Sequence, residues 1–323
     1  MPVPALGWAA LAGAGVVAVA AGGAAWLALF PFVPRDLGGA PDLDALARRL
    51  RIPVGDDAVD AWYVPGTRRA LVLVLHGYGR EHTRAWRYGS FLHRAGYGVL
   101  TLDFRSSRKR GSGRRLPTTL GHHELPDARA ALAWVRRQPE LVGHGIAVLG
   151  ESLGGAVALL LAAEAPEIQA VVVDGAFATG RDAIEDSSER WARVPRRPAA
   201  ALARALGRAA TGHDPGALDA VAAAARLTTR PIYFIHGLKD NRVSERQVRR
   251  LWKAAGAKDA LWVVRDAGHN EPWIRRPEEY RRRVLEFLEA HVAAGETGLA
   301  ARRPAARAPA ARPAAGERLP CAG

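Results

Sequence analysis

Short runs of apolar residues recur along the middle of the chain, and stretches with helical spacing fill most of the gaps between them. The runs are four to six residues long, a length typical of strands that are buried on both faces of a sheet. They are residues 70–75, 98–102, 146–149, 170–173, 231–235 and 261–264. The helical patterns cover residues 124–138, 153–165, 245–255 and 277–292. Strands that alternate with helices predict an α/β fold with a mostly parallel sheet.

Other parts of the chain depart from this alternation. Residues 59–64 alternate polar and apolar positions, and we expect them to open the sheet. Residues 178–217 are long and arginine-rich, which predicts a short cap inserted over the sheet. Residues 295–323 are a tail of Ala, Pro and Arg that we expect to be disordered. The main domain is therefore expected at residues 59–294, after a Pro/Gly-rich linker at 35–58.

The N-terminal region is predicted to be a membrane anchor. The stretch Ala5–Phe30 has no charged side chain, and it is longer than the ~20 residues that cross a bilayer. Trp8 and Trp26 lie near its ends, where interfacial aromatic residues belong. We therefore expect one transmembrane helix within residues 1–34 and a single-pass membrane protein. A cleaved signal peptide or an interfacial segment is the alternative.

The orientation of this anchor follows from the charges beside it. No basic residue precedes the apolar stretch, and several arginines follow it. These are Arg35, Arg48, Arg49 and Arg51. Such a distribution favours a cytoplasmic catalytic domain, although a long domain can be translocated regardless of charge.

The charge of the chain does not indicate a nucleic-acid partner. The 46 Lys and Arg outnumber the 32 Asp and Glu, for a formal net charge of +14, but the excess is scattered instead of gathered into a patch with aromatic residues. The composition of the chain, rich in Ala, Arg, Gly and Pro throughout, explains the excess of positive charge. Attraction to an anionic membrane surface is the alternative explanation. The single cysteine, Cys321, excludes an intrachain disulfide.

A serine lies between a predicted strand and a predicted helix. Residues 150–154 read Gly-Glu-Ser-Leu-Gly, directly after the apolar run 145–149. The small residues Gly150 and Gly154 leave room for the helix to pack back against the strand at a strained turn. Such a turn lifts the Ser152 hydroxyl clear of the sheet, beside the positive end of the helix. We therefore expect Ser152 to be a nucleophile on a nucleophile elbow.

A carboxylate and an imidazole follow in the order that this chemistry needs. Asp240 and His269 each come directly after a predicted strand, and the carboxyl ends of parallel strands share one edge of the sheet. A serine attacks only when a base takes its proton, and the imidazole needs a carboxylate to hold its tautomer. We expect Ser152, Asp240 and His269 to form a catalytic triad. Asp174 also ends a strand and is the competing candidate for the acid.

Most of residues 59–293 resemble serine hydrolases of the α/β-hydrolase superfamily, on the elbow and the Ser–Asp–His order. Two further motifs carry the resemblance. His76-Gly77-Tyr78-Gly79 is similar to the first oxyanion turn of that family. The spacing Gly121-x-x-Glu124-x-x-Asp127-x-x-Ala130 resembles membrane-anchored hydrolase-domain proteins of the prolyl-oligopeptidase-like and serine-aminopeptidase-like type. The chain departs from that type at residues 103–108, where Asp-Phe-Arg-Ser-Ser-Arg replaces Asp-x-Arg-Gly-x-Gly-x-Ser.

The resemblance implies an α/β-hydrolase fold and an oxyanion hole made by the backbone N–H groups of Tyr78 and Leu153. On the same analogy, His76 is a structural turn residue. No cofactor is implied, because acyl transfer by a triad is acid–base and electrostatic work. A metal site at His122, His123 and Glu124 is not expected, because adjacent histidines point apart on a helix and no matching ligand pair appears elsewhere.

We therefore expect a serine hydrolase that cleaves an acyl ester or thioester, with a small-molecule or lipid-like acyl substrate. A serine peptidase and an acyltransferase use the same triad and stay as alternatives. A non-enzymatic binding scaffold would keep the fold without the chemistry.

Overall fold

The computed structural model describes residues 29, 40–107, 116–192, 196–257 and 260–293. The predicted disordered tail and nearly all of the predicted anchor lie outside these residues.

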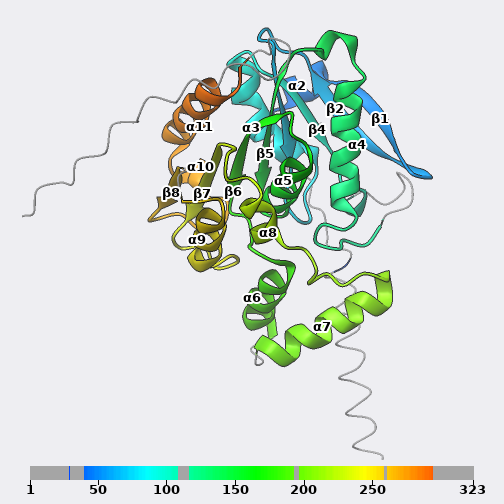
Figure 1. The fold of residues 1–323 in the computed structure, drawn as a ribbon, viewed down its shortest axis with the longest axis vertical. Helices are drawn as coiled ribbons and strands as arrows, with labels where there is room; N and C mark the ends of the chain where they lie inside the picture. Colours follow the sequence, from blue (N-terminus) through cyan, green and yellow to red (C-terminus); the bar gives the residue numbers. More distant parts are fainter. Residues whose placement is uncertain (1–28, 30–39, 108–115, 193–195, 258–259, 294–323) are drawn as a thin grey trace, which may run out of the picture.

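One eight-stranded sheet forms the centre of the described structure, with the strand order β1-β2-β4-β3-β5-β6-β7-β8 (Figure 1). The β1–β2 and β2–β4 pairs are antiparallel, and all the other neighbours run parallel. The strands are β1 (Arg48–Val54), β2 (Asp57–Val64), β3 (Ala70–Leu75), β4 (Gly98–Leu102), β5 (Gly145–Glu151), β6 (Ile168–Asp174), β7 (Ile232–Gly237) and β8 (Leu261–Val264). The predicted apolar runs are thus strands of a mostly parallel sheet.

Helices cover both faces of the sheet, which is why every residue of β3, β4 and β5 is buried. On one face pack α4 (Glu124–Arg136), α5 (Leu153–Glu164), α8 (Ala220–Ala225) and α9 (Glu245–Ala254). On the other face pack α2 (Pro41–Leu46), α3 (His82–Arg94) and α11 (Pro277–His291). Short helical turns are η1 (Arg105–Ser107), η2 (Pro139–Leu141) and α10 (Pro272–Arg275).

Within the predicted linker, residues 48–54 form the edge strand β1. Its residues are Arg-Arg-Leu-Arg-Ile-Pro-Val, and only Ile52 among them is buried. An edge strand has one free side, so it tolerates Pro53 and exposed arginines. All of β1 pairs with β2, and this pairing explains why a segment with such a polar sequence forms a strand.

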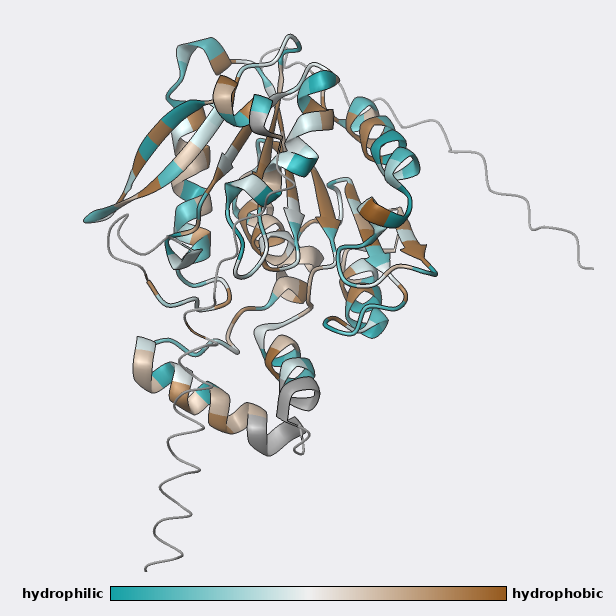
Figure 2. Ribbon diagram, turned by 180° about the vertical axis from the view of Figure 1, so that it is seen from behind, coloured by the Kyte–Doolittle hydropathy of each residue, from teal (hydrophilic) through white to brown (hydrophobic). Residues whose placement is uncertain are grey.

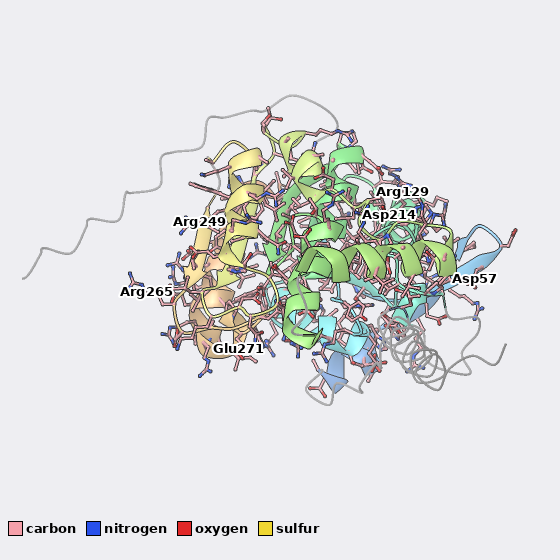
Figure 3. The ribbon with its side chains drawn as sticks, turned by 90° about the horizontal axis from the view of Figure 1, so that it is seen from below. Asp57, Arg129, Asp214, Arg249, Arg265 and Glu271 are labelled. Atoms are coloured by element: carbon pink, nitrogen blue, oxygen red, sulfur yellow. The ribbon has the colours of Figure 1, made fainter. Side chains whose placement is uncertain are left out.

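The residues predicted to form a cap hold α6 (Gly180–Ala192) and α7 (Arg196–Thr211), which extend away from the sheet and its helices (Figures 1 and 2). The two ends of this insertion lie side by side: Gly180 N donates to Leu218 O at 2.9 Å, and Ala220 N donates to Ala178 O at 3.0 Å. Arg204 of α7 pairs with Asp214, which is labelled in Figure 3, in the following loop. The insertion leaves the sheet after β6, at the carboxyl edge of the strands.

The predicted localisation, a single-pass membrane protein, is corrected. Among the helices of the described ranges, none combines the length and the apolar character that a bilayer crossing needs. The longest of these helices, α7, has 16 residues and includes Arg204 and Arg208. At ~1.5 Å per residue it measures about 24 Å, short of a hydrocarbon core of ~30 Å.

Candidate active site

The turn between β5 and α5 holds Ser152 in a strained conformation. Its φ of 51° and ψ of −115° lie in a region that residues other than glycine rarely adopt. A Cβ atom on Gly150 would lie 2.2 Å from Gly154 O, and one on Gly154 would lie 2.2 Å from Leu75 O. Side chains at either position would therefore push α5 away from the strands. Ser152 N donates to Asp174 O at 2.7 Å, which ties the turn to the end of β6.

Three side chains from separate strand ends meet at this turn. Oγ of Ser152 lies 3.0 Å from Nε2 of His269, and Nδ1 of His269 lies 2.7 Å from Oδ2 of Asp240. When Nδ1 carries the proton and donates to the carboxylate, Nε2 is left as an acceptor for the serine hydroxyl. The arrangement can therefore move a proton from Ser152 to His269.

Asp240 is held as an anion by its surroundings. Its other oxygen, Oδ1, accepts the backbone N–H groups of Arg242 at 2.7 Å and Val243 at 2.9 Å. Burial alone raises the pKa of Asp240, but the bond and charge of His269 with these backbone donors hold that pKa below its usual range. An ionised Asp240 fixes the tautomer of the imidazole.

Asp174, the competing acid, does not contact His269 through any hydrogen bond of the described structure. Its Oδ2 accepts the hydroxyl of Tyr280 at 3.0 Å and lies 3.1 Å from that of Tyr88. Burial, partly offset by Arg87, raises the pKa of Asp174 to about 6. A carboxylate whose charged form is destabilised by burial is less suited to stabilise an imidazolium than one that is held ionised.

The turn at residues 76–79 lies against the nucleophile. A Cβ on Gly77 would come 3.4 Å from Cβ of Ser152. Both ring nitrogens of His76 are used in hydrogen bonds that hold the turn: Nδ1 donates to Gly77 O at 2.8 Å, and Nε2 accepts from Phe104 N at 3.1 Å. Leu153 opens α5, and the first N–H groups of a helix have no acceptor within it. Backbone donors can thus face an oxygen held above Ser152.

The Glu124 and Asp127 carboxylates fasten two loops beside the site. Glu124 accepts Thr118 Oγ1 and Gly121 N, each at 2.8 Å. Asp127 accepts the backbone N of Arg105 at 2.8 Å and its Nε at 2.6 Å. The loop that departs from the family pattern is therefore bound through Arg105. The motif pointed to these residues, but its spacing does not say which loops the carboxylates bind.

His122 and His123 lie together with His213 from the cap. The rings of His122 and His213 stack with centroids 3.4 Å apart, and that of His123 is 5.5 Å from His213. Within the described residues, no group of three or more His, Cys, Asp or Glu side chains is arranged to hold a metal ion.

The chain is similar to one protein family and to several known proteins. Residues 66–212 match the family model described as serine aminopeptidase, S33. An uncharacterised protein of Mycobacterium tuberculosis is 29% identical over 233 residues, covering 68% of this chain and 74% of that protein. An uncharacterised protein of Escherichia coli K12, YfhR, is 20% identical over 239 residues, covering 71% and 76%.

Solved structures show the same fold. An esterase of Pyrococcus furiosus has a TM-score of 0.63 at 25% identity, and the match covers 80% of this chain and 98% of the esterase. An acylaminoacyl peptidase of Pyrococcus horikoshii has a TM-score of 0.60 at 15% identity, covering 79% and 43%. The second likeness supports the fold alone.

Proposed function

Because the chain is a serine hydrolase with the α/β-hydrolase fold, we propose that it cleaves acyl esters through an acyl-enzyme on Ser152, with His269 as the base and Asp240 as the acid that orients it. The proposal rests on one observation, the relay from Ser152 through His269 to Asp240 at 3.0 and 2.7 Å. The proposed hydrolase domain is residues 59–294, with residues 178–217 as its cap.

In the first half of the reaction, Ser152 Oγ attacks the ester carbonyl while Nε2 of His269 takes its proton. The carbonyl oxygen becomes an oxyanion, which the backbone N–H groups of Tyr78 and Leu153 receive. His269 then gives its proton to the departing alcohol, and the acyl group stays on Ser152. Asp240 stabilises the imidazolium between these two transfers.

In the second half, water takes the place of the alcohol. His269 removes a proton from the water as it attacks the acyl-enzyme, and returns that proton to Ser152 Oγ. The carboxylic acid leaves and the enzyme is restored. Each step moves only a proton and an acyl group, so the proposed mechanism uses the chain's own residues throughout.

An ester substrate is supported by the likeness to the Pyrococcus furiosus esterase, which extends over 98% of that protein. A peptidase is the second candidate, because the matching family model is that of a serine aminopeptidase. An acyltransferase would share the acyl-enzyme and differ only in the acceptor that resolves it.

A fluorophosphonate probe tests the nucleophile, because it labels a serine only when a base activates it. We expect the native chain to be labelled and Ser152→Ala not to be; labelling of the variant would refute the assignment. p-Nitrophenyl esters of increasing acyl length, set against aminoacyl p-nitroanilides, then separate ester from amide cleavage. Faster cleavage of the anilides would replace the esterase by the peptidase. Added alcohols test acyl transfer through the ester products they would form.

A further inference from the structure

A buried carboxylate lies directly beneath the nucleophile. Glu151 precedes Ser152 in the chain, and only 1% of its surface is exposed. Its Oε1 would lie 3.2 Å from a Cβ built on Gly77, so the carboxylate fills the space under the turn at residues 76–79. Glu151 therefore lies between the turn that carries the nucleophile and the turn that carries Tyr78.

The partners of Glu151 come from the helix that follows that turn. Oε2 accepts Nη2 of Arg87 and, at 3.0 Å, the hydroxyl of Tyr88. Oε1 lies 3.6 Å from Nε of Arg84. All three partners belong to α3, which begins at His82, three residues beyond Gly79. A movement of Glu151 relative to α3 would thus change the position of Tyr78 relative to Leu153.

The same cluster reaches the far side of the nucleophile. The Tyr88 hydroxyl also lies 3.1 Å from Oδ2 of Asp174, whose backbone oxygen accepts Ser152 N. Tyr280 of α11 closes the cluster through its bond to Asp174. The carboxyl groups of Glu151 and Asp174 therefore both lie within hydrogen-bond distance of the Tyr88 hydroxyl of α3.

The pair of Glu151 and Arg87 is charged and almost dry, with 1% and 7% of the two side chains exposed. Burial raises the pKa of Glu151, but Arg87, Arg84, Tyr88 and His269 outweigh it and lower that pKa to about 2. A buried ion pair costs desolvation, and apolar residues of the same volume are often as stabilising. Stability alone therefore gives no reason to place such a pair here.

We propose that Glu151 and Arg87 are positioning residues that brace the nucleophile turn against α3 and thereby set the separation of the two oxyanion donors. This inference rests on the proposed function, because it presupposes an oxyanion at Ser152. It predicts that loosening the pair weakens binding of the transition state more than binding of the substrate.

Arg87→Met, Glu151→Gln and the double variant test the brace. The readouts are kcat, KM and the Ki of a trifluoromethyl ketone, whose adduct with Ser152 places an oxyanion in the hole. Losing one oxyanion donor typically costs ~10²–10³ in rate, so a displaced donor is expected to cost about 10–10² in kcat. We expect Ki to rise by the same factor and KM to stay within about threefold. The double variant is expected to be no worse than the worse single variant, because both changes remove one brace.

Arg129, labelled in Figure 3, and Glu164 supply the matched control. They form a bidentate pair at the surface, with 51% and 37% of their side chains exposed. Glu164→Gln removes the same charge and should leave kcat, KM and Ki unchanged. Far-UV circular dichroism checks that each variant is folded. Should Arg87→Met not fold, Glu151→Gln carries the test, because the amide keeps the shape and an acceptor for Arg87.

Folded variants that keep kcat and Ki within about threefold of the native values would overturn the brace. A rise of KM in step with Ki would also overturn it, because that pattern indicates general distortion of the pocket. An active native enzyme distinguishes these failures from failure of the proposed function. A native chain that neither reacts with the fluorophosphonate nor cleaves esters would overturn both.

Discussion

The carboxylate of Asp174 ends against the hydroxyl of Tyr280, 3.0 Å away, and not against the imidazole of His269. Both Asp174 and Asp240 follow strands that end at the same edge of the sheet, so their positions in the sequence do not separate them. Their environments do separate them. Asp240 accepts two backbone N–H groups and the hydrogen bond of His269. Oδ1 of Asp174 is buried and has no hydrogen-bond partner among the described residues. The surroundings of Asp240 stabilise its charged form, whereas those of Asp174 destabilise it.

The raised pKa of Asp174 predicts that the free energy of unfolding depends on pH. Its pKa is about 6 in the folded chain against 3.8 for the unperturbed group. The unfolded chain therefore loses this proton first, and the free energy of unfolding falls as pH rises from about 4 to about 6, by on the order of 3 kcal/mol. Asp174→Asn keeps the group neutral. In urea unfolding, the stability of this variant minus that of the native chain should be larger at pH 7.5 than at pH 4.5. An equal stability difference at both pH values would contradict this.

Replacing Asp240 and replacing Asp174 should have different effects on kcat. Asp240→Asn leaves His269 without an anion and favours the wrong tautomer, so we expect kcat to fall by about 10³–10⁴. Asp174→Asn should stay within about tenfold of the native kcat, because it is the backbone oxygen of Asp174 that binds the nucleophile turn. The measurement is ester hydrolysis by both folded variants. A larger loss for Asp174→Asn would transfer the role of the acid to Asp174.

The strands and the order of the site residues were predictable because their signals are local. β3 and β5 are continuous apolar runs. Ser152 directly follows β5, and Asp240 and His269 lie a few residues beyond the ends of β7 and β8. Residues that follow parallel strands lie at the same edge of the sheet, the carboxyl edge. Proximity of Ser152, Asp240 and His269 could therefore be expected, although their distances could not.

The rest depends on contacts between distant segments. The helix α3 has the sequence His-Thr-Arg-Ala-Trp-Arg-Tyr-Gly-Ser-Phe-Leu-His-Arg, in which Gly89 and the charged residues obscure the apolar face. Arg87 looks like a solvent-facing residue until its partner Glu151 is known, 64 residues further along the chain. The apolar N-terminal stretch predicted a transmembrane helix, but no helix of the described residues is long and apolar enough to cross a membrane.

The close packing at Gly154 predicts a costly alanine. The added Cβ would lie 2.2 Å from Leu75 O and 2.6 Å from His76 O, so α5 or the end of β3 must move. Overpacking of this kind costs about 1–3 kcal/mol, and it also displaces the turn that holds Tyr78. We expect Gly154→Ala to lower the melting temperature and kcat together. Gly98→Ala is the control, because its nearest atom would lie 3.5 Å away. Equal losses in both variants would indicate a general cost of replacing glycine.

The stacked histidines predict that acid loosens the contact between the cap residues and the core. His213 follows α7, and its ring lies against that of His122 at the start of α4. Burial, then His213 and His123, lower the pKa of His122, whereas Glu124 acts in the opposite direction. A histidine with a lowered folded pKa contributes stability that is lost as pH falls through its unfolded value of 6.5. Amide hydrogen exchange in α7, corrected for the intrinsic rate, should therefore be faster at pH 5.5 than at pH 7.5. His213→Gln should remove most of this difference, while α11 stays unchanged in both chains. If hydrogen exchange in α7 depends on pH equally in the variant and the native chain, the stacked histidine rings do not cause the loosening.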